Sequence, residues 1–147
     1  MKLLIVSVGK PKLDYAKRGA AEYLSRLARY LPVEWKQVKE GSREQEGGRL
    51  LTVSDGCLRV ALDERGELVA SKTLAVRFEK WEQHAGVKTV AFLIGGADGH
   101  AAAVRERADW LWSFSPLTLQ HELTLTVLLE QLYRAQTIRR GEPYHRE

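Results

Sequence analysis

The stretch Thr89-Val90-Ala91-Phe92-Leu93-Ile94-Gly95-Gly96-Ala97-Asp98-Gly99 decides the fold. Its first six residues are almost entirely apolar, which is typical of a strand buried on both faces in a parallel sheet. Three glycines follow within five residues, so the backbone can turn tightly and approach a ligand without interference from Cβ atoms. A plain connection from a strand to a helix would explain one glycine turn equally well. Other parts of the chain must therefore decide whether this turn binds a ligand.

Working outward from this stretch, apolar periodicity predicts alternating strands and helices. We expect strands at residues 3–8, 33–38, 58–62, 89–94 and 110–114. We expect helices at about 13–30, after a cap at Ser71, at about 101–108 and at about 121–138. Residues 40–56 look least structured, with room for a short helix around Arg49. The order predicts an α/β fold with a mostly parallel sheet, helices on both faces, and a single domain over residues 1–147.

Three loops follow the carboxyl ends of predicted strands, where sheets of this class bind ligands. They cover residues 62–66, 95–99 and 115–120. The first strand ends in Gly9-Lys10-Pro11, which does not match the glycine fingerprint of classical dinucleotide sites. The chain also lacks a phosphate-binding loop, a nucleophile elbow and a histidine pair at metal-ligand spacing. Classical Rossmann-type use of a cofactor is therefore disfavoured.

Composition narrows the class of protein further. No apolar run approaches the roughly 20 residues that cross a bilayer, so we expect no membrane association and a cytoplasmic location. Cys57 is the only cysteine, which excludes an internal disulfide and a cysteine-based metal site, and no metal is expected. The short apolar N-terminus is interpreted as a buried strand and not as a signal peptide.

Positive charge is concentrated in the first third of the chain. The net charge is +4, and residues 1–49 carry 11 basic and 6 acidic side chains. A localised basic surface suits RNA, and the candidate contacts are Lys10, Lys12, Lys17 and Arg18. A solvated basic helix with no nucleic-acid partner explains the charge equally well.

Several ordered motifs together resemble the ribosomal RNA large subunit methyltransferase H family. They are Phe92 to Gly99, then Ser115-x-Leu117-Thr118-x-x-His121, Glu130 to Ala135, and Pro143-Tyr144-His145-Arg146-Glu147. The resemblance runs from end to end and is weakest between residues 40 and 58. Ala97 and Gln120 stand where the family usually has proline, and Leu125 replaces a common basic residue.

This resemblance implies a fold of the SPOUT class, in which the C-terminal segment forms a trefoil knot. It also implies a homodimer that uses S-adenosyl-L-methionine to methylate N3 of a pseudouridine in 23S rRNA, within the large subunit or the assembled ribosome. The cofactor contacts that it implies are Leu62, Gly96, Ser115, Pro116, Leu117, Thr118, Leu119 and Gln120.

The C-terminal tail supplies the catalytic candidates. Tyr144 can stack on a base, His145 can accept a proton, and Arg146 can pair with phosphate. His121 is a second candidate base, although a structural role at the start of a helix is favoured for it. Two alternatives stay open: an RNA-binding module of the same fold that has little catalytic activity, and a flavodoxin-like binder of small molecules.

Overall fold

The structure is a computed structural model that describes residues 1–146. Its strands are β1 (Lys2–Val8), β2 (Val33–Val38), β3 (Leu58–Leu68), β4 (Thr89–Ile94) and β5 (Trp110–Ser113). Its helices are α1 (Asp14–Leu27), α2 (Arg43–Val53), α3 (Ser71–Gln83), α4 (Ala102–Arg107) and α5 (His121–Arg139). All five strands are parallel, in the order β2-β1-β4-β3-β5. The α/β fold predicted from the sequence is confirmed.

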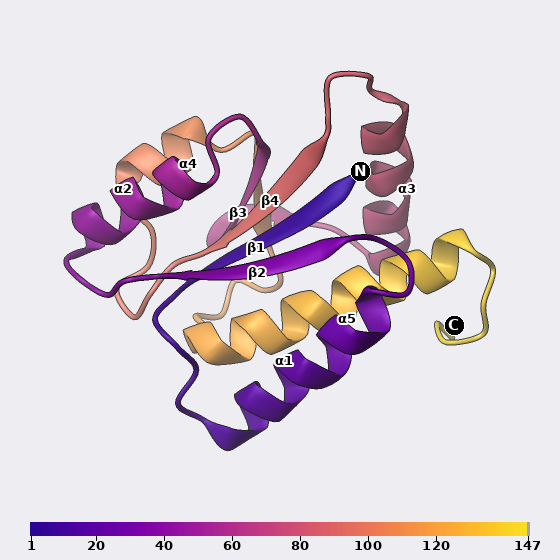
Figure 1. The fold of residues 1–147 in the computed structure, drawn as a ribbon, viewed down its shortest axis with the longest axis horizontal. Helices are drawn as coiled ribbons and strands as arrows, with labels where there is room; N and C mark the ends of the chain where they lie inside the picture. The colour runs from indigo at the N-terminus through magenta and orange to yellow at the C-terminus, as the bar shows by residue number, and fades with distance from the viewer. Residues whose placement is uncertain (147) are drawn as a thin grey trace.

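Strand β4 lies at the centre of the sheet, where Phe92 is paired with Ile5 of β1 and Val60 of β3. All of β4 except Thr89 is buried, because helices cover both faces of the sheet. Helices α2 and α4 lie on one face, and α1, α3 and α5 lie on the other (Figure 1). This arrangement explains the unbroken apolar run in the sequence.

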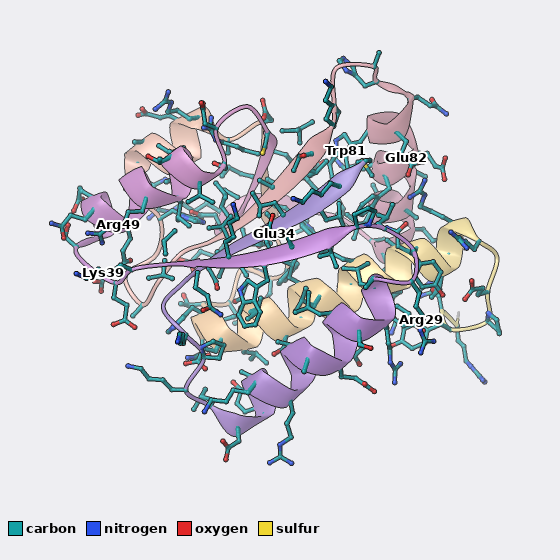
Figure 2. The ribbon with its side chains drawn as sticks, viewed as in Figure 1. Arg29, Glu34, Lys39, Arg49, Trp81 and Glu82 are labelled. Atoms are coloured by element: carbon teal, nitrogen blue, oxygen red, sulfur yellow. The ribbon has the colours of Figure 1, made fainter. Side chains whose placement is uncertain are left out.

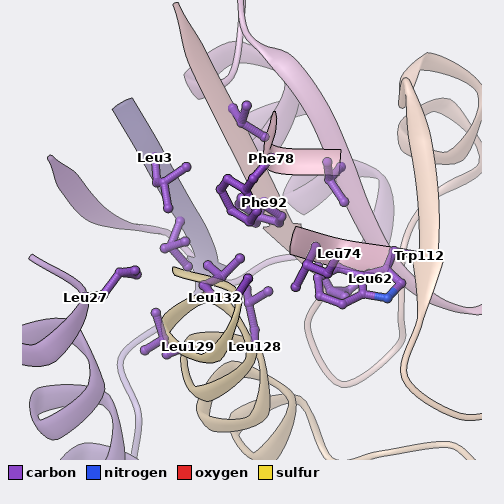
Figure 3. Packing of buried hydrophobic residues seen from close by; sticks show 14 of the residues in the cluster. Leu3, Leu27, Leu62, Leu74, Phe78, Phe92, Trp112, Leu128, Leu129 and Leu132 are labelled. Atoms are coloured by element: carbon purple, nitrogen blue, oxygen red, sulfur yellow. The ribbon is translucent and has the colours of Figure 1, made fainter. Parts of the chain in front are cut away.

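The larger core lies between the sheet and helices α1, α3 and α5. Phe92 and Leu3 meet Phe78, Leu128 and Leu132 there (Figure 3). Each such side chain contributes about 1.5–3 kcal/mol when it is fully buried. Leu125, which replaces a basic residue of the family pattern, is 2% exposed in the same core. Its side chain is therefore a packing group and not a surface contact.

Helix α2 corrects the prediction that residues 40–56 are the least structured, and it contains Arg49, around which a short helix was allowed for. Ser42 and Gln45 form a reciprocal capping box that starts this helix, a signal that the glycines nearby obscured. Leu50 and Leu51 then pack on the second face of the sheet. Arg49 of α2 lies beside Lys39, whose carbonyl oxygen accepts its guanidinium N–H at 3.0 Å (Figure 2).

Three element boundaries also differ from the prediction. Helix α1 ends at Leu27, followed by a turn, and β3 continues to Leu68. Ser71 was expected to cap α3, but it is the first residue of that helix, and Ala70 stands at the cap position. The Ser71 hydroxyl instead donates to Gln131 Oε1 of α5 at 2.6 Å, so it joins two helices.

One buried carboxylate fixes the start of α1 against the start of α5. Glu122 is 8% exposed, and its Oε1 accepts the backbone N–H groups of Lys12 (2.7 Å) and Leu13 (3.0 Å). Burial acts to raise the pKa of Glu122, but these two bonds outweigh it and hold the pKa below its ordinary value. The ionised form therefore stabilises the fold above the pKa of the unfolded chain, and this stability is lost as the pH falls through the folded pKa.

Replacing Glu122 with Gln should lower the free energy of unfolding by about 1 kcal/mol at pH 7, because a neutral amide is a weaker acceptor. The deficit should shrink at acidic pH, below the lowered pKa of Glu122 in the folded protein, where the wild-type carboxylate is protonated. Urea denaturation at both pH values measures it, with Glu106→Gln on exposed α4 as the control. A deficit that does not change with pH would contradict this role.

Candidate functional site

A cleft of about 280 Å³ lies at the carboxyl ends of the strands. The three loops expected to bind a ligand line it, and they come from β3, β4 and β5. The end of the sheet thus brings together three segments that are spread between residues 62 and 120 of the sequence. This convergence is what distinguishes the glycine turn from a plain connection.

The glycine turn is held by its own backbone. The Gly99 N–H donates to the Gly96 carbonyl oxygen at 3.0 Å, and Gly99 has a left-handed φ of 75°. A Cβ atom on Gly95 would lie 2.9 Å from the carbonyl carbon of Gly99. A Cβ on Gly96 would lie 2.7 Å from Glu46 Oε1 of α2. Only glycine therefore fits these two positions without displacing a neighbour.

Residues 63–66 leave the regular path of β3 and cross toward β5. Leu62 and Glu67 are both in register with Trp112, so the four residues between them bulge out of the ladder. Gly66 lies so close to β5 that a Cβ there would be 2.6 Å from the Leu111 carbonyl carbon. The Thr118 hydroxyl donates to Glu64 and joins this bulge to the third loop.

The third loop is pre-shaped by short-range hydrogen bonds. Ser113 Oγ donates to the Ser115 carbonyl oxygen at 2.8 Å, and Ser115 Oγ accepts the Leu117 N–H at 3.0 Å. The cap of α5 is Gln120, whose Oε1 accepts the Glu122 and Leu123 N–H groups, and His121 is the first residue of the helix. A fixed loop with backbone polar groups can recognise a flat heterocycle at little entropic cost.

Six of the eight expected cofactor contacts line the cleft: Leu62, Gly96, Ser115, Leu117, Thr118 and Leu119. Pro116 and Gln120 do not. His121 also lines it, from the first turn of α5. The sequence interpretation missed Arg43 and Arg105, which helices α2 and α4 bring to the cleft, and His100, which directly follows the glycine turn.

The tail residues Tyr144, His145 and Arg146 do not line the cleft of their own chain. The Tyr144 ring packs edge-on against Tyr133 at 4.7 Å between centroids, under the Arg134 guanidinium. Arg134 Nη1 and His145 Nδ1 are 3.1 Å apart, and Arg146 is exposed. Arg134 lies about 20 Å along α5 from His121, the first residue of this helix, which lines the cleft. One chain therefore does not bring its own tail to its own cleft.

Burial, with a hydrogen bond to Tyr23, raises the pKa of Tyr144 to about 12. The phenol therefore keeps its proton near neutral pH, and Tyr144 can donate a hydrogen bond but cannot act as a base there. Of the tail residues, this leaves His145 as the group able to accept a proton.

The basic candidates lie at the start of α1, and all four are exposed. The backbone of Lys12 is bonded to Glu122, the neighbour of the cleft residue His121. Lys10 and Lys12 thus belong to a segment that is tied to the rim of the cleft.

Comparison with known proteins gives the family. A family model described as "Predicted SPOUT methyltransferase" matches residues 1–145. The chain belongs to the SPOUT methyltransferase family. SPOUT relatives named ribosomal RNA large subunit methyltransferase H include one from Thermus thermophilus, 50% identical over 146 residues and covering 99% of both chains. Another, from Deinococcus radiodurans, is 42% identical with the same coverage.

A solved structure of a probable methylase family protein from Haemophilus influenzae shares this fold. Its TM-score is 0.55 at 12% identity, and the match covers 99% of this chain and 70% of that one. Within residues 1–146, no helix has the length and apolarity that crossing a membrane requires. In the same residues, no cluster of three or more His, Cys, Asp or Glu side chains is arranged to hold a metal ion.

Replacing Gly95 with Ala should destabilise the fold by about 1–3 kcal/mol, because the added methyl meets backbone that cannot move aside. Gly48→Ala is the matched control, since a Cβ on this helical glycine meets nothing within 4 Å and gains up to about 1 kcal/mol of helix propensity. Urea denaturation of both variants measures the difference. A Gly95→Ala protein as stable as the wild type would disprove the close approach.

Proposed function

We propose that this protein transfers the methyl group of S-adenosyl-L-methionine to N3 of a pseudouridine in 23S rRNA, acting in the cytoplasm on the large subunit or the assembled ribosome. The observation that carries the proposal is the convergence of three backbone-rich loops on one cleft, in a chain whose relatives are named as rRNA methyltransferases. The trefoil knot implied by the family resemblance stays a prediction.

The residues of the cleft fit this cofactor. The loop 115–120 offers fixed backbone groups for the adenine edge, and Gly96 presents main chain alone to the cleft that it lines. Asp63, Glu64 and Asp98 line the cleft and suit the ammonium and sulfonium charges. When bound, S-adenosyl-L-methionine supplies an activated methyl group on a cationic sulfur.

What the chain itself must do is align the target nitrogen and remove its proton. Alignment in a closed site can contribute several kcal/mol to the rate. His145 is the proposed proton acceptor, Tyr144 the stacking and donating group, and Arg146 the phosphate contact. His121, on the rim of the cleft, is the second candidate base.

A homodimer reconciles the position of the tail with this chemistry. The tail residues lie about 20 Å along α5 from the cleft of their own chain, so we infer that they serve the cleft of a second copy. Tyr23, Tyr30 and Tyr133 form a half-buried aromatic surface around Tyr144, with Arg26 over two of the rings. Tyrosine and arginine are enriched at protein interfaces.

The RNA face is proposed to be the start of α1, with Lys10, Lys12, Lys17 and Arg18. The bond from Lys12 N–H to Glu122 ties this exposed basic segment to the first turn of α5, next to the cleft. An RNA bound there would approach the site where the methyl group is transferred.

The proposal is tested by incubating the protein with labelled S-adenosyl-L-methionine and ribosomes that lack the modification. We expect label at N3 of one pseudouridine in 23S rRNA.

Deleting residues 143–147 should slow methyl transfer by about a hundredfold or more. Cofactor affinity should survive the deletion, and so should the dimer, which light scattering measures. Changing the four basic residues to Gln should weaken RNA binding and flatten its salt dependence.

The control for the change of the four basic residues is Lys80→Gln with Lys88→Gln, which removes positive charge at two exposed positions away from the start of α1.

Cofactor binding without transfer to any ribosomal substrate would favour the RNA-binding module. A bound flavin with no affinity for S-adenosyl-L-methionine would favour the flavodoxin-like binder. A particle of 16.7 kDa at micromolar concentration would refute the dimer.

A further inference from the structure

His100 is a buried histidine in the lining of the cleft. It is 5% exposed, and it follows Gly99, whose left-handed backbone turns the chain back toward the end of β4. Arg105 Nη1 donates to the His100 carbonyl oxygen at 2.7 Å and fixes its backbone. The ring therefore has a defined position beneath the glycine turn.

One ring nitrogen of His100 has a partner and the other does not. Nε2 lies 3.1 Å from the Leu93 carbonyl oxygen, and because a carbonyl only accepts, Nε2 carries a proton. Nδ1 is buried and has no hydrogen-bond partner among the described residues. A buried polar atom without a partner costs about 1–3 kcal/mol, so its position calls for a function.

The protonation state of the ring decides what Nδ1 can bind. Burial lowers the pKa of His100 below its ordinary value, although Leu93, Asp63 and Leu62 favour the charged ring. Arg105 opposes the charge. The ring is therefore neutral near pH 7, and Nδ1 is a hydrogen-bond acceptor.

A neutral acceptor is best matched by a neutral donor. An ammonium group in this cleft would prefer the carboxylates of Asp63, Glu64 or Asp98, which also line it. A hydroxyl or amine group of a nucleoside is a neutral donor, so it carries no charge that must be paired with a carboxylate and can bond to Nδ1.

We propose that His100 is a positioning residue whose Nδ1 accepts a hydrogen bond from a hydroxyl or amine of the adenosine half of S-adenosyl-L-methionine. The inference rests on the proposed function. It adds a neutral side-chain acceptor to a site whose other proposed contacts are backbone groups and carboxylates, and His100 holds the ligand without touching the transferred methyl.

Two substitutions separate this role from a structural one. Asn is short enough to place an acceptor near the position of Nδ1 but loses the bond to Leu93. Gln reaches the Leu93 carbonyl with its amide but offers no acceptor at Nδ1. We expect His100→Gln to bind S-adenosylhomocysteine about tenfold more weakly than the wild type, and His100→Asn to stay near it. Adenosine alone should show the same order.

Calorimetry measures the affinities, and thermal unfolding reports whether each variant folds. A purely structural tie to Leu93 predicts the reverse order, with Gln near the wild type and Asn impaired, and that result would overturn the inference. The same order for S-adenosylhomocysteine but not for adenosine would overturn the assignment to the adenosine half. Wild-type protein that binds neither ligand would overturn the proposed function and the inference with it.

Nitrogen NMR of the wild type provides a readout that needs no variant. The chain has four histidines, so the ring signals of His100 can be assigned. We expect a neutral ring protonated at Nε2, with an Nδ1 signal that shifts when S-adenosylhomocysteine is added. An Nδ1 signal that does not move at saturating ligand would contradict the proposed contact.

Discussion

The close approach of Gly95 to Gly99 is the constraint on which the site depends. Strand β4 is buried on both faces, so the chain must reverse at its end in the little space left between β1 and β3. A turn without side chains meets that demand and leaves main-chain groups at the edge of the sheet. The same turn returns His100 beneath the loop and leads the chain into α4 on the second face.

The two neighbouring loops are built on the same plan. The bulge at residues 63–66 lies against β5 because Gly66 has no side chain, and Thr118 joins it to the loop that follows β5. Ser113 and Ser115 shape that loop from within. Polar main chain is thus fixed before any ligand arrives, which lowers the ordering cost of binding.

Much of this could be predicted from the sequence, because the strands are short apolar runs and the loops have distinctive glycines. A short helix around Arg49 was allowed for, but the start of α2 was not predicted, since its capping box stands among glycines that suggest a loop. His100 was missed because only the path of the chain after Gly99 shows that its ring is buried. The tail residues were identified by the chemistry of their side chains and by a motif of the family resemblance, but sequence does not show that they lie far from the cleft of their own chain.

The central claim is that three loops at the carboxyl end of the sheet form one site for S-adenosyl-L-methionine. Backbone amide NMR during titration with this cofactor tests it most directly. The account predicts that the largest shifts fall within residues 62–66, 95–100 and 113–121 together, with smaller changes elsewhere. Shifts confined to the opposite end of the sheet, or to one of the three loops alone, would contradict it.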